Sequence, residues 1–366
     1  MREIASVELH VVSMELKVLE NMYLKKFYDL GDRSFRLAFS GKEGSAQAYC
    51  RLTKVINKST FSEEAQGSTT FATAVRKRLV GMKLDAVSQH GTDRILEMGF
   101  SGKDEKRSLI IEMFGKGNVI LVNNGVIELA YNIAEQRDRA VKPKAQYSFP
   151  SASTETYEEI DVGKIERIVA NAEEENTIAI KALAKKLDAG PLYLEDVLSK
   201  ASIDPKGSAS MIKSHESTLK KSIIELLDCT GSPKPRIYYK DGKAVDYAIG
   251  PIKKYEGLES TEYPTLSELL DHYYMDERQQ LPADENRKLK ELEASIEKQM
   301  QLIKSVEGEE KAYAEAGRAI MSHMNELNEL ISFLEEHRNA TLEEVRARFN
   351  NVNGLDLKGK RFTITL

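Results

Sequence analysis

The chain has 366 residues, of which 41% are hydrophobic and 30% are charged, and its formal net charge is −5. This length allows two or three domains, and the composition is that of a soluble globular protein with some long exposed helix. No apolar run reaches the roughly 20 residues that span a bilayer, and the first residues include Arg2, Glu3 and Glu8, unlike a signal peptide. Cys50 and Cys229 make no disulfide framework, and no His or Cys lies at metal-ligand spacing. We therefore expect a cytoplasmic protein without a metal or another cofactor.

The charge is unevenly distributed along the chain. Residues 281–345 contain fifteen acidic and eight basic residues, a net of −7, so the remaining residues sum to about +2. A near-neutral body with local basic patches can bind RNA. The charge permits this function but does not by itself indicate it.

The first fifty-five residues predict a helix followed by strands. Residues 1–22 show an approximate 3.6-residue apolar period, which predicts an amphipathic helix. Residues 27–30 and 34–39 flank Gly31-Asp32, which is typical of a β-hairpin. Residues 47–55 are expected to continue the sheet.

The stretch from Gln89 to Gly125 predicts three strands joined by short turns. Its apolar runs are 95–100, 109–114 and 119–122, and Gly and Asn residues separate them. Two charged features are unusual in this setting. Asp93-Arg94 lies where the first strand begins, and Glu112 lies inside an otherwise apolar strand.

Two segments carry clustered cations. Residues 71–79 predict a short helix with three cations in one turn, and residues 137–150 form a basic, Pro-bounded edge. Each segment is either an ordinary solvated surface or a phosphate-contacting patch. The cations are Arg76, Lys77, Arg78, Arg137, Arg139, Lys142 and Lys144.

The middle of the chain is expected to be helical. Residues 151–175 are a Ser/Thr/Glu-rich linker leading into a helix, and residues 176–230 contain two short helices joined at Gly190-Pro191. A helix-hairpin-helix-like module uses such a turn to meet a phosphate, and an ordinary helical hairpin fits equally well. Asp241-Gly242 then predicts a second β-hairpin, and residues 266–274 predict a helix.

Residues 284–337 carry an interrupted heptad pattern that predicts a long coiled-coil arm. Such a stripe needs a partner helix, and no second segment of similar length follows it. Residues 341–349 predict a short capped helix, and the chain then ends in an apolar strand, RFTITL. We expect the sequence to be truncated within a longer protein.

Catalytic motifs are absent. The chain has no phosphate-binding glycine loop, no GxSxG and no HExxH, and GKGN at 115–118 has the spacing of a turn. Asp93 and Glu112 could form a carboxylate pair, but residues in adjacent strands more often form salt bridges, and Arg94 is available. We expect no enzyme.

The order and spacing of these motifs resemble the NFACT family across essentially all of the chain. The motifs are FATAVRKRL (71–79), QHGTDRIL (89–96), LIIEMFGKGNVIL (109–121), the edge that ends in Tyr147 and Pro150, ALAKKLDAGPLYLEDVLSKASID (182–204) and DHYY (271–274). Each motif is short, and their combination is specific. Ala145 departs from the family's glycine before the Tyr147 edge.

The resemblance implies an α+β multidomain fold. Residues 1–153 would form a mixed-sheet domain similar to the N-terminal domain of formamidopyrimidine-DNA glycosylases, and 176–230 a helix-hairpin-helix-like domain. Residues 231–280 would form a small connecting α/β segment, 284–337 the coiled-coil arm, and 338–366 its truncated tip. The family's further C-terminal RNA-binding domain and the returning helix would be missing.

The resemblance also implies a function in ribosome quality control. The family binds a large ribosomal subunit that carries a stalled peptidyl-tRNA and recruits charged tRNA for untemplated C-terminal tailing, while the ribosome performs peptidyl transfer. The Asp-Arg pair for tRNA recruitment falls on Asp93 and Arg94. A further acidic residue falls on Glu8, where the eukaryotic pattern has Asp. The coiled-coil arm would contact a protein at the ribosomal stalk base.

Three other functions were considered. A DNA glycosylase needs an N-terminal proline nucleophile followed by glutamate, and this chain begins Met1-Arg2-Glu3. A cell-surface adhesin, suggested by the fibronectin-binding label of some family members, would be expected to have a signal peptide, an anchor or disulfides. A nucleic-acid-binding coiled-coil scaffold without tRNA specificity would leave Asp93-Arg94 without a role.

Overall fold

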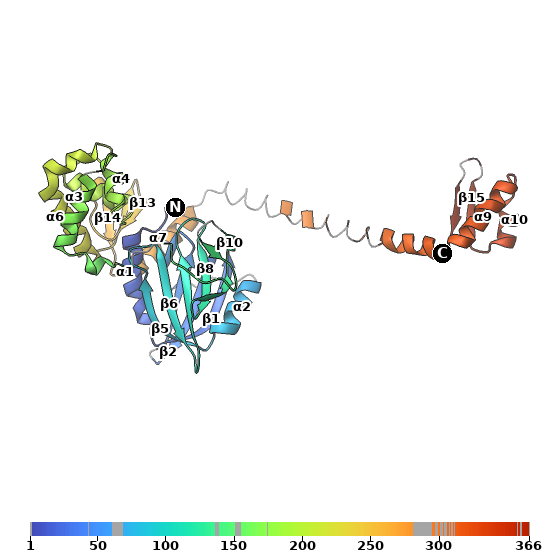
Figure 1. Cartoon of the computed structure of the whole chain (residues 1–366), viewed down its shortest axis with the longest axis horizontal. Helices are drawn as coiled ribbons and strands as arrows, with labels where there is room; N and C mark the ends of the chain where they lie inside the picture. The colour runs from blue at the N-terminus through green and yellow to red at the C-terminus, as the bar shows by residue number, and fades with distance from the viewer. Residues whose placement is uncertain are drawn as a thin grey trace. The chain divides into compact units, whose positions relative to one another are not determined.

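The computed structural model describes residues 2–365 (Figure 1), apart from 43, 61–68, 136–138, 151–154, 174, 281–294, 297–298, 301–302, 304–305, 307, 309, 311, 357 and 359–360. The chain divides into two compact units, Met1–Gln280 and Leu281–Leu366.

The first unit is built on a nine-stranded antiparallel sheet with strand order β4-β3-β2-β1-β5-β6-β7-β8-β9. Apart from the junction between β1 and β5, each strand pairs with the next in sequence, as in a meander. The strands are β1 (Tyr23–Gly31), β2 (Ser34–Gly41), β3 (Gly44–Arg51), β4 (Val55–Lys58), β5 (Lys83–Gln89), β6 (Ile95–Ser101), β7 (Lys106–Glu112), β8 (Asn118–Asn123) and β9 (Val126–Ala130).

The turns explain why these hairpins form where the sequence predicts them. Asp32 and Arg33 both have positive φ (45° and 56°) between β1 and β2, and Asn124 and Gly125 do so (49° and 79°) between β8 and β9. Two consecutive residues with positive φ are the geometry of a type I′ turn, whose twist matches that of paired strands. The predicted hairpin at 31–32 and the three strands between 95 and 122 are confirmed.

Two sheet predictions need correction. Strand β5 lies before Gln89, in a segment that the sequence left unassigned, because Lys83–Gln89 is largely polar and several of its side chains are exposed. The single strand expected at 47–55 is two strands. The chain bends between β3 and β4 at Thr53, which has a φ of 68°.

The N-terminal helix is shorter and more buried than predicted. It is α1 (Ser6–Leu16), followed by a 3-10 turn, η1 (Lys17–Leu19). The expected amphipathic pattern is wrong, because α1 is buried on nearly all sides: it packs against β4, β5 and two further helices of the unit. A helix that is surrounded in this way needs no polar face.

The sheet has apolar side chains on both faces. On its inner face, Phe27, Phe35 and Phe100 belong to the same core cluster as residues of α1 and α2. Helix α2 (Thr70–Leu79) is the short basic helix that the sequence predicted. On the outer face of β6–β9, a separate cluster that includes Ile95 is covered by the aromatic residues of 147–149. The two-residue strands β10 (Ala134–Glu135) and β11 (Ala140–Val141) pair beside it.

A group of helices lies beside the sheet within the same unit (Figure 1). The predicted break at Gly190-Pro191 is confirmed, because Gly190 is the N-cap of α5 with a φ of 87° and Pro191 is its first residue. The elements are η2 (Tyr157–Glu159), α3 (Val162–Glu173), α4 (Ala179–Ala184), α5 (Pro191–Lys200), η3 (Ala209–His215) and α6 (Glu216–Gly231).

The rest of the first unit ties back to the N-terminus. It contains β12 (Arg236–Lys240), β13 (Lys243–Ala248), η4 (Lys253–Tyr255), β14 (Glu259–Glu262) and α7 (Leu266–Gln280). Asp241 and Gly242 form the predicted hairpin turn, with φ of 52° and 72°. The backbone N–H groups of Leu266 and Ser267, at the start of α7, donate to the Glu15 carboxylate of α1 at 2.7 and 2.8 Å. These two bonds cap α7 with a side chain that lies 251 and 252 positions away in the sequence.

The second unit contains α9 (Met324–Glu336), α10 (Leu342–Arg348), β15 (Val352–Asp356) and β16 (Arg361–Ile364), and residues 312–322 before α9 are also helical. The predicted capped helix at 341–349 is confirmed, since Thr341 and Glu344 form a capping box. The C-terminal strand is also confirmed and pairs with β15. In the heptad segment 284–337, residues 312–322 and α9 are helical, while 284–294 and several positions up to 311 lie outside the described residues. The coiled-coil arm stays a prediction.

The α+β class is therefore confirmed, but the sheet that was expected to be mixed is antiparallel in all its described strand pairs. The predicted domain boundaries and the helix-hairpin-helix assignment stay predictions. Across the part of the chain that the structure describes, no helix is both long enough and apolar enough to cross a membrane.

Candidate nucleic-acid interface

Asp93 and Arg94 lie at the end of a tight turn between β5 and β6. Gly91 has a φ of 52°, and the Asp93 N–H donates to the His90 carbonyl at 3.0 Å, so the turn closes on itself. The Gln89 side-chain amide donates to the Asp93 carbonyl at 2.8 Å, and the Ser6 hydroxyl of α1 donates to the Thr92 carbonyl. The turn is thus held from both sides and presents its charged side chains on a rigid support.

The two charged side chains of this turn have different partners. Arg94 donates through Nη1 to Oε2 of Glu3 at 2.6 Å, and both side chains are partly exposed. Within the described residues, the Oδ2 atom of Asp93 is buried and has no hydrogen-bond partner. Burial raises the pKa of Asp93, and His90 partly opposes this. The expected salt bridge between Arg94 and Glu112 is not formed.

A third segment brings Asp188 to the same place. Asp188 is exposed as a residue, but its carboxyl group is partly buried, and this burial raises the pKa of Asp188. The positive charge of Arg94 lowers this pKa, and the negative charge of Asp93 raises it. The loop that carries Asp188 is close to α1, because a Cβ atom on Gly190 would come within 2.7 Å of the Cβ of Ala5. We call Glu3, Arg94, Asp188 and Asp93 the Arg94 cluster. Only Glu3 pairs directly with the Arg94 guanidinium, and Asp188 is close enough for Arg94 and Asp93 to affect its pKa. With three carboxyl groups and one guanidinium, the cluster is net acidic when all four are ionised.

The third residue of the predicted tRNA site, Glu8, lies elsewhere. Its side chain is fully buried and pairs with Arg2. It accepts a hydrogen bond from the Tyr193 hydroxyl of α5 at 2.7 Å and from the Ala5 N–H at 2.8 Å. Arg2 also donates to Asp246 of β13 at 2.7 Å. Glu8 therefore joins three elements of the interior and does not belong to the Arg94 cluster.

The basic edge at 137–150 is largely engaged within the protein. Arg139 pairs with the buried Glu112 and donates to the Ser148 carbonyl at 2.7 Å, and Lys142 pairs with Glu135. Lys144 is exposed. Arg137 lies outside the described residues. Glu112, unusual in an apolar strand, is thus explained by its pairing with Arg139.

Helix α2 keeps part of its positive charge available. Lys77 is exposed, whereas Arg78 pairs with Glu128 at 3.3 Å, and the Arg76 guanidinium donates to the Ala72 carbonyl at 3.3 Å. The three cations therefore do not form a uniform patch.

An aromatic platform beside the Arg94 cluster was not predicted. The rings of His90 and Phe149 stack with centroids 3.5 Å apart and an interplanar angle of 2°. Tyr147 packs edge-on to Phe149 and donates through its hydroxyl to Glu112 at 3.1 Å. His90 belongs to the same turn as Asp93. The pairing joins residues about sixty positions apart, so no local sequence signal could reveal it.

The family model described as NFACT N-terminal and middle domains matches residues 6–353. The chain belongs to the NFACT family. Among its relatives, the Archaeal Rqc2 homolog aRqcH of Methanocaldococcus jannaschii is 26% identical over 290 residues, which are 74% of this chain and 42% of that protein. Ribosome quality control complex subunit 2 of Schizosaccharomyces pombe is 29% identical over 126 residues, 32% of this chain and 12% of that protein. This NFACT chain thus matches less than half the length of these relatives.

A solved structure of the fibrinogen binding protein from Staphylococcus aureus shares the fold of this NFACT chain. Its TM-score is 0.60 at 19% identity, covering 74% of this chain and 98% of that one. The resemblance of the sheet domain to formamidopyrimidine-DNA glycosylases stays a prediction, because matched glycosylase structures reach a TM-score of only 0.31.

Proposed function

We propose that this NFACT chain acts in ribosome quality control as a binding factor. It binds a large ribosomal subunit that carries a stalled peptidyl-tRNA and recruits charged tRNA for untemplated tailing. The names of the archaeal and fission-yeast relatives support the pathway. The chain itself supplies binding and not catalysis, since the ribosome performs peptidyl transfer. The coiled-coil arm and its contact with a stalk-base protein, and a cytoplasmic location, belong to the same proposal.

The Arg94 cluster is the part of the proposal that the geometry supports best. A net acidic cluster repels phosphate groups, so it suits an RNA backbone poorly. The exposed edge of a nucleobase offers N–H donors and carbonyl acceptors together, which carboxylates and a guanidinium can match. Sequence-specific RNA recognition favours unpaired bases in loops, whose edges are accessible. The cluster would therefore read a base in a tRNA loop.

Glu8 contributes indirectly in this proposal. Because it is buried, it contacts no RNA and acts as a positioning residue: it holds the start of α1, from which Glu3 reaches Arg94. Lys77 and Lys144 are both exposed, so in this proposal their charges are available to the phosphates of a bound RNA.

The test is a pull-down from cell lysate with sequencing of the bound RNA. The wild-type chain is compared with Arg94→Ala and with Arg236→Ala, a matched control whose guanidinium pairs with Glu262 at 2.7 Å in the β12–β14 sheet. We expect large-subunit rRNA with all three proteins, and a restricted set of tRNAs that Arg94→Ala loses and Arg236→Ala keeps. Ribosomal RNA without a tRNA difference would reject the site, and no enrichment of RNA would reject the function.

A further inference from the structure

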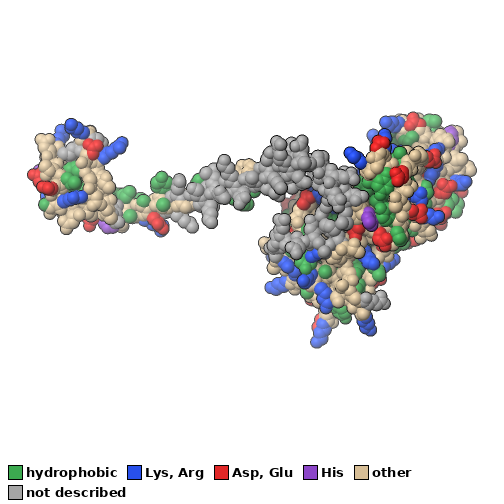
Figure 2. Space-filling view, turned by 180° about the vertical axis from the view of Figure 1, so that it is seen from behind, with side chains coloured by type: hydrophobic (Ala, Val, Ile, Leu, Met, Phe, Trp, Pro, Cys, Tyr) green, Lys and Arg blue, Asp and Glu red, His purple; other side chains and the backbone are tan. Residues whose placement is uncertain are grey.

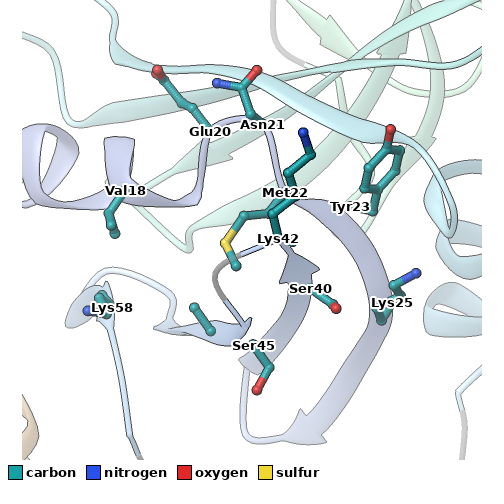
Figure 3. Close-up of a pocket in the computed structure, with 12 residues that line it drawn as sticks. Val18, Glu20, Asn21, Met22, Tyr23, Lys25, Ser40, Lys42, Ser45 and Lys58 are labelled. Carbon is teal, nitrogen blue, oxygen red and sulfur yellow. The ribbon is translucent and has the colours of Figure 1, made fainter.

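A hollow surface lies at the opposite end of strand β5 from the Arg94 cluster. It has a cavity volume of about 830 Å³ and lies where η1 leads into β1 and where β2 turns into β3 (Figure 3). Tyr23, at its rim, pairs with Lys83 at the start of β5, while Gln89 at the other end of β5 leads into the Arg94 turn. With about 3.3 Å per residue, the two sites lie roughly 20 Å apart along the strand.

Three lysines from different strands or turns surround this hollow. Lys25, Lys42 and Lys58 are all exposed, and none forms an ion pair with a residue that the structure describes. Figure 3 shows Lys25 and Lys58 on opposite sides of the hollow in this view, with Ser40 and Ser45 between them. Figure 2 shows Lys and Arg side chains recurring over the lower end of the sheet, where its hairpins project.

The one acidic residue among the described lining residues is already engaged. The Glu20 carboxylate accepts a hydrogen bond from the Val87 N–H of β5 at 2.9 Å. The described lining is therefore net positive, in contrast to the Arg94 cluster. The hollow attracts an anion with several separated charges, because its lysines stand apart and do not converge on one point.

Exposed apolar surface accompanies these charges. Tyr23 is 46% exposed, and Lys25 Nζ lies 5.8 Å from the centroid of its ring. The hydroxyls of Ser40 and Ser45 line the hollow. Single-stranded nucleic acid binds surfaces that combine cations along its backbone, hydroxyl donors and an exposed aromatic ring. Its phosphates pair with the lysines, and its bases stack on the ring. An acidic peptide would use the cations and leave the ring without a partner.

We propose that this surface, the β1–β3 lysine groove, binds the sugar-phosphate backbone of single-stranded RNA with a base against Tyr23. This site goes beyond the base-reading role of the Arg94 cluster and has the opposite charge. An RNA that contacts both sites is held at two points along β5, by its backbone at one end and by a base edge at the other.

The experiment measures binding of the full chain to a fluorescein-labelled oligouridine of about 12 nucleotides, a length suited to single-strand sites. The triple variant Lys25→Gln/Lys42→Gln/Lys58→Gln is compared with Lys181→Gln/Lys240→Gln/Lys243→Gln, whose three lysines are also exposed. Fluorescence anisotropy is recorded between about 50 and 200 mM KCl. Circular dichroism and thermal unfolding confirm that both variants fold.

We expect the groove variant to bind at least about tenfold more weakly and its salt slope to fall by about 2, because each single-strand phosphate contact contributes about 0.7. The control variant, with the same change in net charge, should lose less than about twofold. Equal losses in the two variants would show a general charge effect and overturn the groove. Unchanged binding of the groove variant would overturn it as well.

Two further measurements separate the parts of the inference. Tyr23→Ala should weaken oligouridine binding by about fivefold without changing the salt slope, since stacking is not ionic; no loss would remove the base contact.

An oligoglutamate peptide that competes as well as RNA would overturn the RNA assignment in favour of an acidic protein segment. Oligouridine binding is compared among the lysine and Tyr23 variants, and tRNA recovery is compared between wild type and Arg94→Ala, so the groove and the proposed tRNA site can fail independently.

Discussion

The Arg2–Glu8 pair and the Arg94–Glu3 pair use the same chemistry in opposite environments. Glu8 is fully buried and receives hydrogen bonds from three residues, Arg2, Ala5 and Tyr193, whereas Glu3 and Arg94 are partly exposed and meet at the end of a turn. Breaking a buried pair leaves a charge without a partner in the interior, while an exposed pair contributes little to stability. Burial therefore separates a structural pair from one that is available to a ligand.

The largest expected effect follows from Glu8→Ala. The substitution removes the buried acceptor of the Tyr193 hydroxyl and one of the two carboxylates that pair with the Arg2 guanidinium, the other being Asp246. We expect a loss of about 3–5 kcal/mol in the free energy of unfolding, which corresponds to a fall of about 10 °C in the thermal midpoint for a domain of this size. Thermal unfolding followed by circular dichroism measures it, with Glu3→Ala as control, expected within about 1 kcal/mol of wild type. Equal effects would remove the distinction between the pairs.

Gly190→Ala tests the contact that brings Asp188 to the Arg94 cluster. The residue has a φ of 87°, and its new Cβ would lie 2.7 Å from the Cβ of Ala5. Both the backbone strain and the overlap destabilise the fold, and we expect a loss of about 1–3 kcal/mol. Chemical denaturation measures it. Gly231→Ala is the matched control, because its Cβ would meet no atom within 4 Å, and a comparable loss there would contradict the contact.

Arg94→Ala should separate binding from stability. Its ion pair with Glu3 is partly exposed, so we expect a change below about 1 kcal/mol in the free energy of unfolding. The same variant should lose tRNA in the pull-down. A large loss of stability would mean that Arg94 supports the turn and that its binding phenotype is secondary.

The smallest expected effect concerns pH. Burial raises the pKa of both Asp93 and Asp188 in the folded state. The native protein then holds protons that the unfolded chain releases, so stability falls as the pH rises through the unfolded pKa. Asp93→Asn/Asp188→Asn should raise the thermal midpoint at pH about 7 and leave it unchanged at pH about 3, where all these carboxyls are protonated. Asp104→Asn is the exposed control, and a gain at both pH values would reject the electrostatic cause.

The sequence could predict features whose cause is local. The turns at 32–33, 124–125 and 241–242 need positive φ, and Gly, Asn and Asp mark them directly. The position of Asp93 and Arg94 just before a strand is also local in cause, because the apolar run of β6 begins at Ile95. Helix α10 was predicted through its capping box, in which Thr341 and Glu344 are three residues apart.

Features that depend on distant partners could not be predicted. The burial of α1 arises from strands and helices far along the chain, so its apolar period gave the wrong pattern. Glu112 pairs with Arg139 and not with Arg94, and Asp93 raises the pKa of Asp188 although the two lie almost a hundred positions apart in the sequence. Strand β5 is stabilised by β1 and β6 on its two sides, although its own residues are poor strand formers.

The capping of α7 by Glu15, together with the bond from Arg2 to Asp246, has a consequence for folding. These contacts join residues 244 to 252 positions apart. The entropy of closing such a loop must be overcome before the contacts form, and high contact order slows folding. Helix α1 cannot reach its final environment until α7 has been synthesised and has left the ribosomal exit tunnel. During translation its apolar surface stays available to chaperones for the time needed to make about 250 residues.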